Sequence, residues 1–494
     1  MIPNFNTAPQ TAPGASAAVG HTIENSIPLS IFPIKLDKFC IFVCGLPGRG
    51  KTGISRRLAR YLSFFHAVPV KCFNASEYRR QAFGIWKDAG CFDAANPESN
   101  AQLGHIGDII LAEMTTYMNE NANGITILDS GSLLATSVRR TTAMQAMHKI
   151  GAKVLFIEVC SDDEGTPPTP YNSPDYEGVP KDIADRDYRE RVLKYKSAYE
   201  VVDGDPAYRE ARYSYLKCNH ERKHFVLHRV EGYLQLKVVH FIINIGIVGH
   251  DFFLSRHGQS EYNAQGRIGG DSGLSQHGLA YAHKLAEFVE EKVVQNELGE
   301  SQPGRLWTST MRRTRETAQF IKQPRLMIPD QDNPTLEHEW IQMRPRAWHH
   351  LDELYAGACD GMTYEEIEEQ FPDEFARRSI DKLAYRYPRG ESYLDVVARL
   401  EPIVIEMERH REPLVIVGHQ GILRIIYAFY MGLSRADAPY VSIPLNCVTQ
   451  LTPSAFRCVE VKHVLYEGLV GHDGQTEVKG KGPLASSFNN PDSH

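Results

Sequence analysis

Short apolar runs alternate along the chain with longer stretches whose apolar residues recur at helical spacing. The runs that predict buried strands lie at residues 39–44, 125–128, 154–160 and 238–243. The stretches that predict helices between them include residues 54–64, 103–118 and 184–200. Strands that alternate with helices favour parallel sheets covered by helices. The alternation starts again at residue 250 and continues to residue 455, so the pattern predicts two doubly wound α/β domains.

Composition shifts along the chain predict where these domains begin and end. The apolar run at 238–248 indicates a core strand that leads into the second domain, with the boundary near residue 247. Residues 1–33 are rich in Ala, Pro, Thr and Asn, and residues 468–494 in Gly, Ser, Asn and Pro, which favours flexible tails. We therefore expect a first domain at 34–246 and a second at 247–467.

Charge and cysteine content narrow the possible partners and compartment. The net charge is −7 and the pI about 6.3, which argues against a general attraction to nucleic acids or membrane surfaces. Nine cysteines occur without a Cys-x-x-Cys pair, and no secretory signal is recognised, so we expect reduced thiols in the cytoplasm. No apolar run approaches the roughly 20 residues that span a bilayer, so no membrane segment is expected.

Two predicted strands each lead directly into a histidine. One strand ends at Arg256 and His257, and a second ends at His419, with Arg424 in the helix that follows. A third strand end opens a helix that carries Arg313. Ligands bind at the carboxyl ends of such strands, and arginines hold phosphate oxygens in a fork. The arrangement predicts phosphoryl transfer to His257; the alternative is two core histidines beside a basic surface helix.

A glycine-rich loop follows the first predicted strand. Residues 45–52 read Gly-Leu-Pro-Gly-Arg-Gly-Lys-Thr, a full P-loop pattern between a strand and a helix. Backbone amides of such a loop cradle phosphates, its lysine reaches the β- and γ-phosphates, and its threonine hydroxyl can bind Mg²⁺. The strand at 125–128 ends in an aspartate, a candidate metal ligand or base. The residues predicted to hold Mg-ATP are Gly45, Gly48, Gly50, Lys51, Thr52 and Asp129, with Thr52 and Asp129 facing the metal.

Three motifs in the second half, at residues 266–275, 362–367 and 385–393, carry a resemblance to a known family. With the two histidines they resemble the histidine phosphatase superfamily, and within it the bisphosphatase half of the 6-phosphofructo-2-kinase/fructose-2,6-bisphosphatase family. The resemblance implies that His257 accepts the 2-phosphate and that Glu353 protonates the departing sugar oxygen. A carboxyl near phosphate groups holds its proton more readily than in water, as a general acid must. The residues that would hold the transferred group are Arg256, Asn263, Gly269, Arg313 and His419.

The same resemblance implies a separate grip on the 6-phosphate of the sugar. Arg389 stands where the family usually has Lys, which keeps the charge and changes its geometry. Leu383 and Ala384 stand where the family often has Tyr and Arg, so one basic contact is expected to be missing. The residues implied for this grip are Tyr364, Arg386, Arg389, Tyr393, Gln420 and Arg424.

The first half resembles the kinase partner of the same family, through the P-loop, Asn74, the Tyr-Arg-Arg of residues 78–80 and the Ser-Pro-Asp-Tyr of residues 173–176. Arg79 and Arg80 are therefore expected to belong to the kinase site. This half also departs from the family pattern. Residues 128–134 keep the acid but lose an amide and threonines, residues 170–172 stand where the family has a lysine, and Gly104 or His105 stands where it has an arginine. The segment at 161–170 looks shorter than the family's helical lid. Because phosphoryl transfer depends on such cations, we expect ATP binding with weak kinase turnover or none.

The expected activity is hydrolysis of fructose 2,6-bisphosphate to fructose 6-phosphate and phosphate, through a phosphohistidine and without a cofactor in the phosphatase half. The resemblance also implies a homodimer. Three alternatives stay open: a fully bifunctional kinase and phosphatase, a mutase or phosphatase for another sugar phosphate, and a P-loop half that acts as a nucleotide sensor and dimerisation module for the phosphatase.

Overall fold

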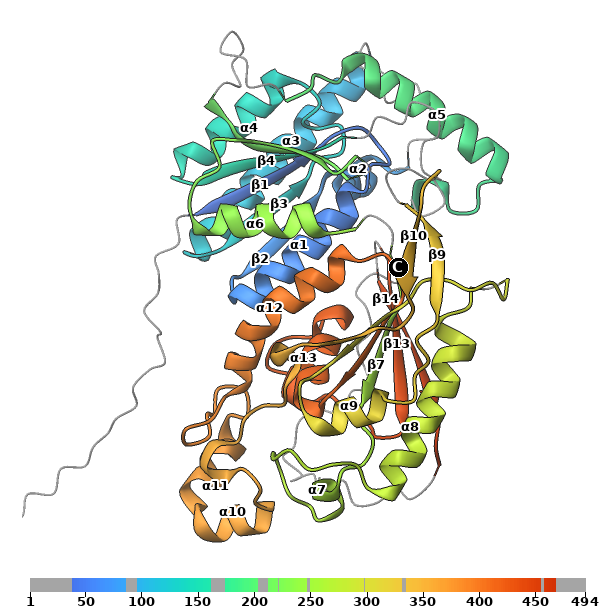
Figure 1. Cartoon of the computed structure of the whole chain (residues 1–494). Helices are drawn as coiled ribbons and strands as arrows, with labels where there is room; N and C mark the ends of the chain where they lie inside the picture. The colour runs from blue at the N-terminus through green and yellow to red at the C-terminus, as the bar shows by residue number, and fades with distance from the viewer. Residues whose placement is uncertain are drawn as a thin grey trace, which may run out of the picture. The chain divides into compact units, whose positions relative to one another are not determined.

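The computed structural model describes residues 38–85, 96–160, 174–202, 212–220, 222–246, 249–296, 298–330, 335–454 and 457–467. The predicted tails, the segment at 161–170, residues 170–172 and the predicted boundary at residue 247 lie outside these ranges. Within them, the predicted α/β class is confirmed: there are two six-stranded sheets with parallel strands, each accompanied by helices (Figure 1). No helix in these ranges has the length and apolar character needed to cross a membrane.

The first sheet has the strand order β2-β3-β1-β4-β5-β6, in which only β6 runs antiparallel to its neighbour. Its strands are β1 (Phe39–Cys44), β2 (Val70–Asn74), β3 (Ile125–Asp129), β4 (Lys153–Val159), β5 (Ser214–Asn219) and β6 (His224–His228). The helices of this half are α1 (Lys51–His66), α2 (Ala75–Phe83), α3 (Pro97–Glu120), α4 (Ser137–Lys149), α5 (Lys181–Ala198) and α6 (Tyr233–Asn244). The predicted strands at 39–44, 125–128 and 154–160 and the three predicted helices are confirmed.

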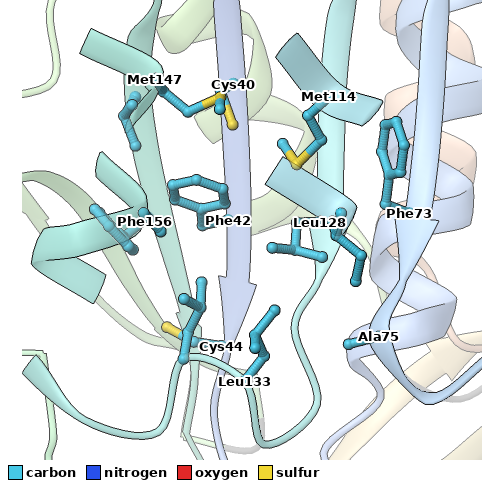
Figure 2. Close-up of a cluster of buried hydrophobic side chains, with 14 of the residues drawn as sticks. Cys40, Phe42, Cys44, Phe73, Ala75, Met114, Leu128, Leu133, Met147 and Phe156 are labelled. Atoms are coloured by element: carbon cyan, nitrogen blue, oxygen red, sulfur yellow. The ribbon is translucent and has the colours of Figure 1, made fainter. Parts of the chain in front are cut away.

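One face of this sheet packs into an apolar core. Figure 2 shows part of it, with Phe42 of β1, Leu128 of β3, Phe156 of β4 and Met114 of α3 close together. All six residues of β1 are buried, which explains why this strand is apolar throughout rather than alternating. A central strand buried on both faces holds the loop that follows it in a fixed position.

The predicted strand at 238–243 is wrong, because these residues belong to helix α6. Their buried members include Val238, Val239 and Ile242, while Ile243 is exposed, and this is the spacing of one helical face. Several β-branched residues in a short apolar run resemble a buried strand, and periodicity alone cannot separate the two cases. The helix starts after Gly232, whose φ of 89° marks the turn into it.

The second sheet has the strand order β11-β8-β12-β7-β13-β14. Its strands are β7 (Phe252–Arg256), β8 (Arg305–Thr308), β11 (Pro345–Ala347), β12 (Leu414–Gly418), β13 (Cys447–Pro453) and β14 (Cys458–Val464). A separate hairpin pairs β9 (Arg325–Pro329) with β10 (Glu337–Ile341). The helices are α7 (Glu261–Ala264), α8 (Gln276–Phe288), α9 (Arg312–Ala318), α10 (Tyr364–Gln370), α11 (Pro372–Ile380), α12 (Tyr393–Arg409) and α13 (Gln420–Met431).

Three adjacent strands of this sheet end at the same edge. β8, β12 and β7 pair in parallel, with Gly418 opposite Arg256 and Val417 opposite Thr308. The residues that directly follow these strands are therefore neighbours in space. They are His257 after β7, Ser309 after β8 and His419 after β12.

Candidate active site

Arg313 lies between the two histidines. Its Nε donates to Nε2 of His257 at 3.2 Å and to Nδ1 of His419 at 3.3 Å. The two imidazole rings are 5.1 Å apart between centroids, and all three side chains are buried. Helix α9 positions the guanidinium, whose Nη1 also donates to the carbonyl oxygen of Gly270 at 2.6 Å. The structure thus brings together the three residues that the sequence placed on separate strand ends.

The hydrogen bonds of His257 determine which ring nitrogen is free to react. Nδ1 lies 2.8 Å from the carbonyl oxygen of Gly258, which can only accept, so Nδ1 carries the proton. Nε2 accepts from Arg313 and therefore holds a lone pair. Burial, with Arg313 and Arg256 nearby, holds the pKa of His257 well below its usual range. A neutral imidazole with an available Nε2 is the form that a nucleophile requires.

The loop after His257 is held by short-range contacts around Asn263 and Gly269. The Asn263 side chain accepts from the backbone amide of Ser260 at 3.1 Å and so caps α7. Gly269 has a φ of +68°, and a Cβ there would lie 1.8 Å from Oδ1 of Asp360, so only glycine fits. Arg256 is buried at the end of β7. Arg256 is the chain neighbour of His257, whereas the contacts of Asn263 and Gly269 are with Ser260 and Asp360, so their role in holding the transferred group stays a prediction.

Glu353 reaches the same edge of the sheet from another loop. Its carboxylate accepts from the backbone amide of Leu354 at 2.9 Å and from that of Gly421 at 3.3 Å. Gly421 lies in the first turn of α13, two residues after His419. The carboxyl group of Glu353 therefore lies beside the start of α13, close to His419, where a proton donor for a leaving group is needed.

A second cluster of cations lies around Tyr364 and Tyr393. Arg424 donates to the hydroxyl of Tyr393 at 3.2 Å, and Arg378 to that of Tyr364 at 3.1 Å. Burial, with Arg424 and Arg378 nearby, lowers the pKa of Lys382 to about 7. Sequence reasoning missed Arg378 and Lys382. The paired arginines of α11 look like ordinary surface residues in the sequence, and no spacing marks Arg378 or Lys382 as site residues, because Tyr364 lies on the separate helix α10.

The structure does not bring Arg386 and Arg389 into that cluster. Arg386 pairs with Asp395 at 2.5 Å, and its side chain is 61% exposed. Arg389 is exposed in a turn, with a φ of 61°. Gln420 is the first residue of α13 and is half-buried beside His419. Their positions in a sequence motif suggested both arginines. In the structure, Arg378 of α11 and Lys382 of the turn after it belong to the cluster instead.

The P-loop site lies at the carboxyl end of β1. Thr52 and Asn74 both donate to Oδ2 of Asp129, at 2.5 and 2.9 Å. Lys51 is buried and donates to the carbonyl oxygen of Leu46 at 2.7 Å. A Cβ at Gly45, whose φ is 129°, would lie 2.4 Å from the carbonyl oxygen of Val159. Gly48 and Gly50 also have positive φ.

Burial dominates the electrostatics of this site. It lowers the pKa of Lys51 and raises the pKa of Asp129, and the attraction between the two groups opposes both shifts. A bound nucleotide would supply phosphate oxygens to the lysine and a metal ion to the carboxylate. The residues present therefore fit Mg-ATP: Lys51 for the phosphates, Thr52 and Asp129 for the metal.

Arg79 and Arg80, expected in the kinase site, both contact Asp175. The distances are 2.6 Å from Arg79 and 3.4 Å from Arg80, and Arg191 of α5 adds a third contact at 3.5 Å. Asp175 belongs to the Ser-Pro-Asp-Tyr motif, so that motif closes onto α2. One buried carboxylate thus gathers three arginines near the P-loop half's sheet.

The departures from the kinase pattern are visible in the same region. Leu133 and Leu134 are buried in the apolar core, where Figure 2 shows Leu133 beside Cys44. A Cβ on Gly104 would meet nothing within 4 Å, so this position on α3 is open. These are two of the positions where the resemblance implied polar or cationic groups, and His105 is the alternative to Gly104 for the missing arginine.

These observations define a class of protein: a P-loop half followed by a half with a buried histidine nucleophile. Residues 30–248 match the family model for 6-phosphofructo-2-kinase, and residues 252–464 match the histidine phosphatase superfamily, branch 1. The chain belongs to the 6-phosphofructo-2-kinase/fructose-2,6-bisphosphatase family.

Curated relatives of that name match most of the chain. The protein from Aquarana catesbeiana is 36% identical over 85% of this chain and 83% of its own length. The one from Caenorhabditis elegans is 37% identical over 85% of this chain and 87% of its own length. A Saccharomyces cerevisiae relative, 34% identical over 85% of this chain and 87% of its own length, is named fructose-2,6-bisphosphatase alone. The kinase domain implies use of ATP.

Proposed function

We propose that the chain hydrolyses fructose 2,6-bisphosphate to fructose 6-phosphate and inorganic phosphate. The observation that carries this proposal is the contact of Arg313 with both His257 and His419 at the edge of the second sheet. One cation held between a nucleophile and a second histidine matches the charge of a phosphoryl group in transfer. Membership of the family supplies the substrate.

The reaction has two steps. Nε2 of His257 attacks the phosphorus of the 2-phosphate, the bond from phosphorus to the sugar oxygen breaks, and Glu353 gives its proton to that oxygen. A water molecule then attacks the phosphohistidine, loses its proton to Glu353 and releases phosphate, which regenerates the free imidazole. Covalent transfer replaces one difficult displacement with two easier ones. Arg256, Arg313 and His419 stabilise the equatorial oxygens in both steps.

Because Arg256 and Arg313 supply positive charge and His419 offers a further hydrogen-bonding group, we propose that the phosphatase half works without a metal cofactor. Chelation by EDTA would then leave the rate unchanged, while loss of activity that Mg²⁺ restores would contradict this. The 6-phosphate is assigned to the second cation cluster, which comprises Tyr364, Arg378, Lys382, Tyr393, Gln420 and Arg424. Arg386 and Arg389 are assigned to the rim of the site.

The first half is proposed to bind Mg-ATP with weak or no transfer to fructose 6-phosphate. Lys51, Thr52 and Asp129 provide the nucleotide site. The apolar Leu133 and the bare Gly104 support weak turnover, since each lost donor to a transferring phosphoryl group costs about 100-fold to 1,000-fold in rate. We propose 34–246 and 247–467 as the two domains.

A homodimer is proposed through the outer strand β6. This strand lies at the edge of the first sheet, where Val226 and Leu227 are 36% and 48% exposed. An unpaired edge with apolar side chains is a template for pairing with a second copy. Sedimentation of wild type and Leu227→Lys tests it: a dimer that the charge dissociates supports the proposal, and a monomeric wild type contradicts it.

A nucleotide sensor is the second candidate function for the P-loop half, and the contacts of α1 favour it. This helix starts with Lys51 and Thr52. Further along, Arg57 pairs with Glu408 of α12, and Arg60 donates to the carbonyl oxygen of Tyr430 in α13 at 2.9 Å. Both α12 and α13 begin at the phosphatase site, with Tyr393 and directly after His419. One helix therefore contacts the nucleotide loop and both helices that carry phosphatase residues.

The decisive assay for the main proposal measures two products. Purified protein with fructose 2,6-bisphosphate is expected to release phosphate and fructose 6-phosphate in equal amounts, with a base-stable, acid-labile phosphoprotein that His257→Ala lacks. A mutase would give an isomeric bisphosphate without free phosphate. A phosphatase for another sugar phosphate would show a higher kcat/KM for that compound in the same assay. Either result would overturn the proposal.

A further inference from the structure

His419 has a second contact, on the side of the ring away from Arg313. Its Nε2 lies 2.7 Å from Oγ of Ser309, the residue that follows β8. Both side chains are fully buried, as is that of Thr314, whose Oγ1 is 2.8 Å from the Ser309 hydroxyl. Neither Ser309 nor Thr314 has a place in the reaction described above.

The donors and acceptors of this cluster fit one arrangement of hydrogens. The guanidinium of Arg313 can only donate, so Nδ1 of His419 accepts and its proton is on Nε2. Nε2 therefore donates to Oγ of Ser309, which also accepts from the amide of Met311 at 3.2 Å. Having two donors already, the serine hydroxyl gives its own hydrogen to Thr314.

Thr314 completes the series, because its hydroxyl is 2.9 Å from the carbonyl oxygen of Met311, a group that can only accept. Each of the two hydroxyl groups then donates once. The directions are set by Arg313, which can only donate, at one end of the series and by the Met311 carbonyl, which can only accept, at the other. Reversing the proton on His419 would set its Nδ1–H against the Nε–H of Arg313, and the serine would have to turn its hydrogen from Thr314 to Nε2. In a buried site an unmade bond of this kind is costly.

We infer that Ser309, oriented by Thr314, is a positioning residue that holds the proton of His419 on Nε2 and so keeps the Nδ1 lone pair turned toward Arg313 and His257. When the 2-phosphate arrives with one proton on a phosphate oxygen, that proton can pass to Nδ1 without any movement of the ring, and the resulting imidazolium faces the phosphoryl oxygens. This inference rests on the proposed function for its catalytic meaning, while the tautomer is a property of the free protein.

A structural role for Ser309 is the competing explanation, because its hydroxyl also accepts from the amide of Met311 at the start of α9. Two variants separate the roles. Ser309→Ala removes the contacts of the serine hydroxyl with His419 and with the Met311 amide. Thr314→Val keeps the contact between Ser309 and the Met311 amide and nearly the same side-chain shape. It leaves the serine hydrogen free to turn toward His419 and oppose the proton on Nε2. Thr314→Ser restores the hydroxyl and serves as the conservative rescue.

The experiment combines nitrogen NMR of ¹⁵N-histidine-labelled full-length protein with steady-state kinetics on fructose 2,6-bisphosphate. The His419 signals are assigned by their absence in His419→Ala. In wild type we expect the Nε2-protonated form; in Ser309→Ala and Thr314→Val we expect a mixture or the Nδ1-protonated form. Loss of an orienting partner of this kind costs about 10-fold to 100-fold, here in kcat with KM little changed, and Thr314→Ser recovers most of it.

A fall in kcat without a change of tautomer in either variant would assign Ser309 to structure alone and overturn the inference. So would a change of tautomer that leaves kcat unaltered, or a wild-type His419 that carries its proton on Nδ1. Failure of the proposed function gives a different result: wild type would not release phosphate from fructose 2,6-bisphosphate. The NMR spectra of the free protein would still show which nitrogen of His419 carries the proton.

Discussion

The two phosphate sites of this chain differ in what surrounds them. At the edge of the second sheet, Arg313 contacts both histidines, and a separate set of cations surrounds Tyr364 and Tyr393. At the P-loop, the nucleotide-binding residues are present, while Leu133 lies in the apolar core and a Cβ on Gly104 would meet nothing within 4 Å. A P-loop binds nucleotide phosphates, whereas transfer of a phosphoryl group needs further cations around that phosphoryl group.

If the first half turns over weakly, as we propose, the comparison separates two requirements: groups that bind phosphates and groups that accelerate their transfer. Glycines, a lysine and a threonine suffice to cradle phosphates because they act on the ground state. Acceleration requires groups that interact more strongly with the transition state. The second site has such groups in buried, mutually fixed positions. We therefore expect the two halves to respond very differently to substitution.

The largest effect is expected at the nucleophile. His257→Ala removes the atom that accepts the phosphoryl group, so phosphate release from fructose 2,6-bisphosphate should fall about 10,000-fold or more. The rate is measured by release of labelled phosphate, with the thermal unfolding temperature as the control for folding. A variant within tenfold of wild type would show that another group is the nucleophile.

The second-largest effect is expected for Arg313→Ala, with a loss of about 100-fold to 1,000-fold in kcat. Among the described residues, this guanidinium is the one cation that contacts both imidazoles. Arg313→Lys retains the charge but not the shared Nε contact, and should stay at least tenfold below wild type. Equal rates for the lysine variant and wild type would mean that charge alone matters. Single-turnover kinetics would separate this step from product release.

The second cation cluster is tested by KM. Arg378→Ala is expected to raise KM for fructose 2,6-bisphosphate by about 10-fold to 100-fold, the cost of losing a charged hydrogen bond. Arg386→Ala is the matched control, an arginine paired with Asp395 and largely exposed, and should change KM by less than about threefold. If Arg386→Ala proves the more damaging of the two, the 6-phosphate lies nearer the turn than we propose.

The dependence on pH gives a smaller effect. Lys382 has a pKa of about 7 in the free protein, so it is charged below pH 7 and loses its charge as the pH rises through that value. kcat/KM should therefore fall by about tenfold above pH 7, the loss of one charge pair, and Lys382→Met should remove that alkaline limb. The pKa of His257 lies well below its usual range, so the acid limb should appear well below the pH at which a histidine ordinarily titrates. An unchanged alkaline limb in Lys382→Met would remove Lys382 from the substrate site.

The smallest effect concerns communication between the halves. If the P-loop half senses nucleotide, Mg-ATP should change the phosphatase rate severalfold in wild type and not in Lys51→Ala. Arg57→Lys should still bind ATP but weaken the response, since Arg57 pairs with Glu408 and donates to the carbonyl oxygen of Gly246. ATP affinity is measured separately by calorimetry. A response that survives in Lys51→Ala would exclude the sensor.

Much of the architecture could be predicted because its signals are local. Strands β1, β3, β7 and β12 are mostly apolar since all their residues are buried, and in each sheet the residues after these parallel strands fall at one edge. Helix α6 could not be separated from a strand, because a short apolar run fits both periods. The wrong prediction for residues 238–243 shows that the hydrophobic pattern of a short apolar run does not determine its secondary structure.

The candidate site divides in the same way. His257 and His419 follow strands directly, and Arg313 lies in the helix that begins after a third strand, so topology brings them together. Arg378 and Lys382 depend on how α10, α11 and the turn after them fold back, which no spacing in the sequence reveals. Ser309 looked like an ordinary residue of a strand end, and only its 2.7 Å contact with His419 gives it meaning.

The most direct test of the difference between the halves uses His257→Ala, in which any bisphosphate that forms cannot be removed by the phosphatase. The variant is incubated with Mg-ATP and fructose 6-phosphate, and fructose 2,6-bisphosphate is measured over time, with Lys51→Ala in the same background as the control. We predict little or no product. Accumulation of bisphosphate that Lys51→Ala abolishes would contradict the account and show that the first half is a working kinase.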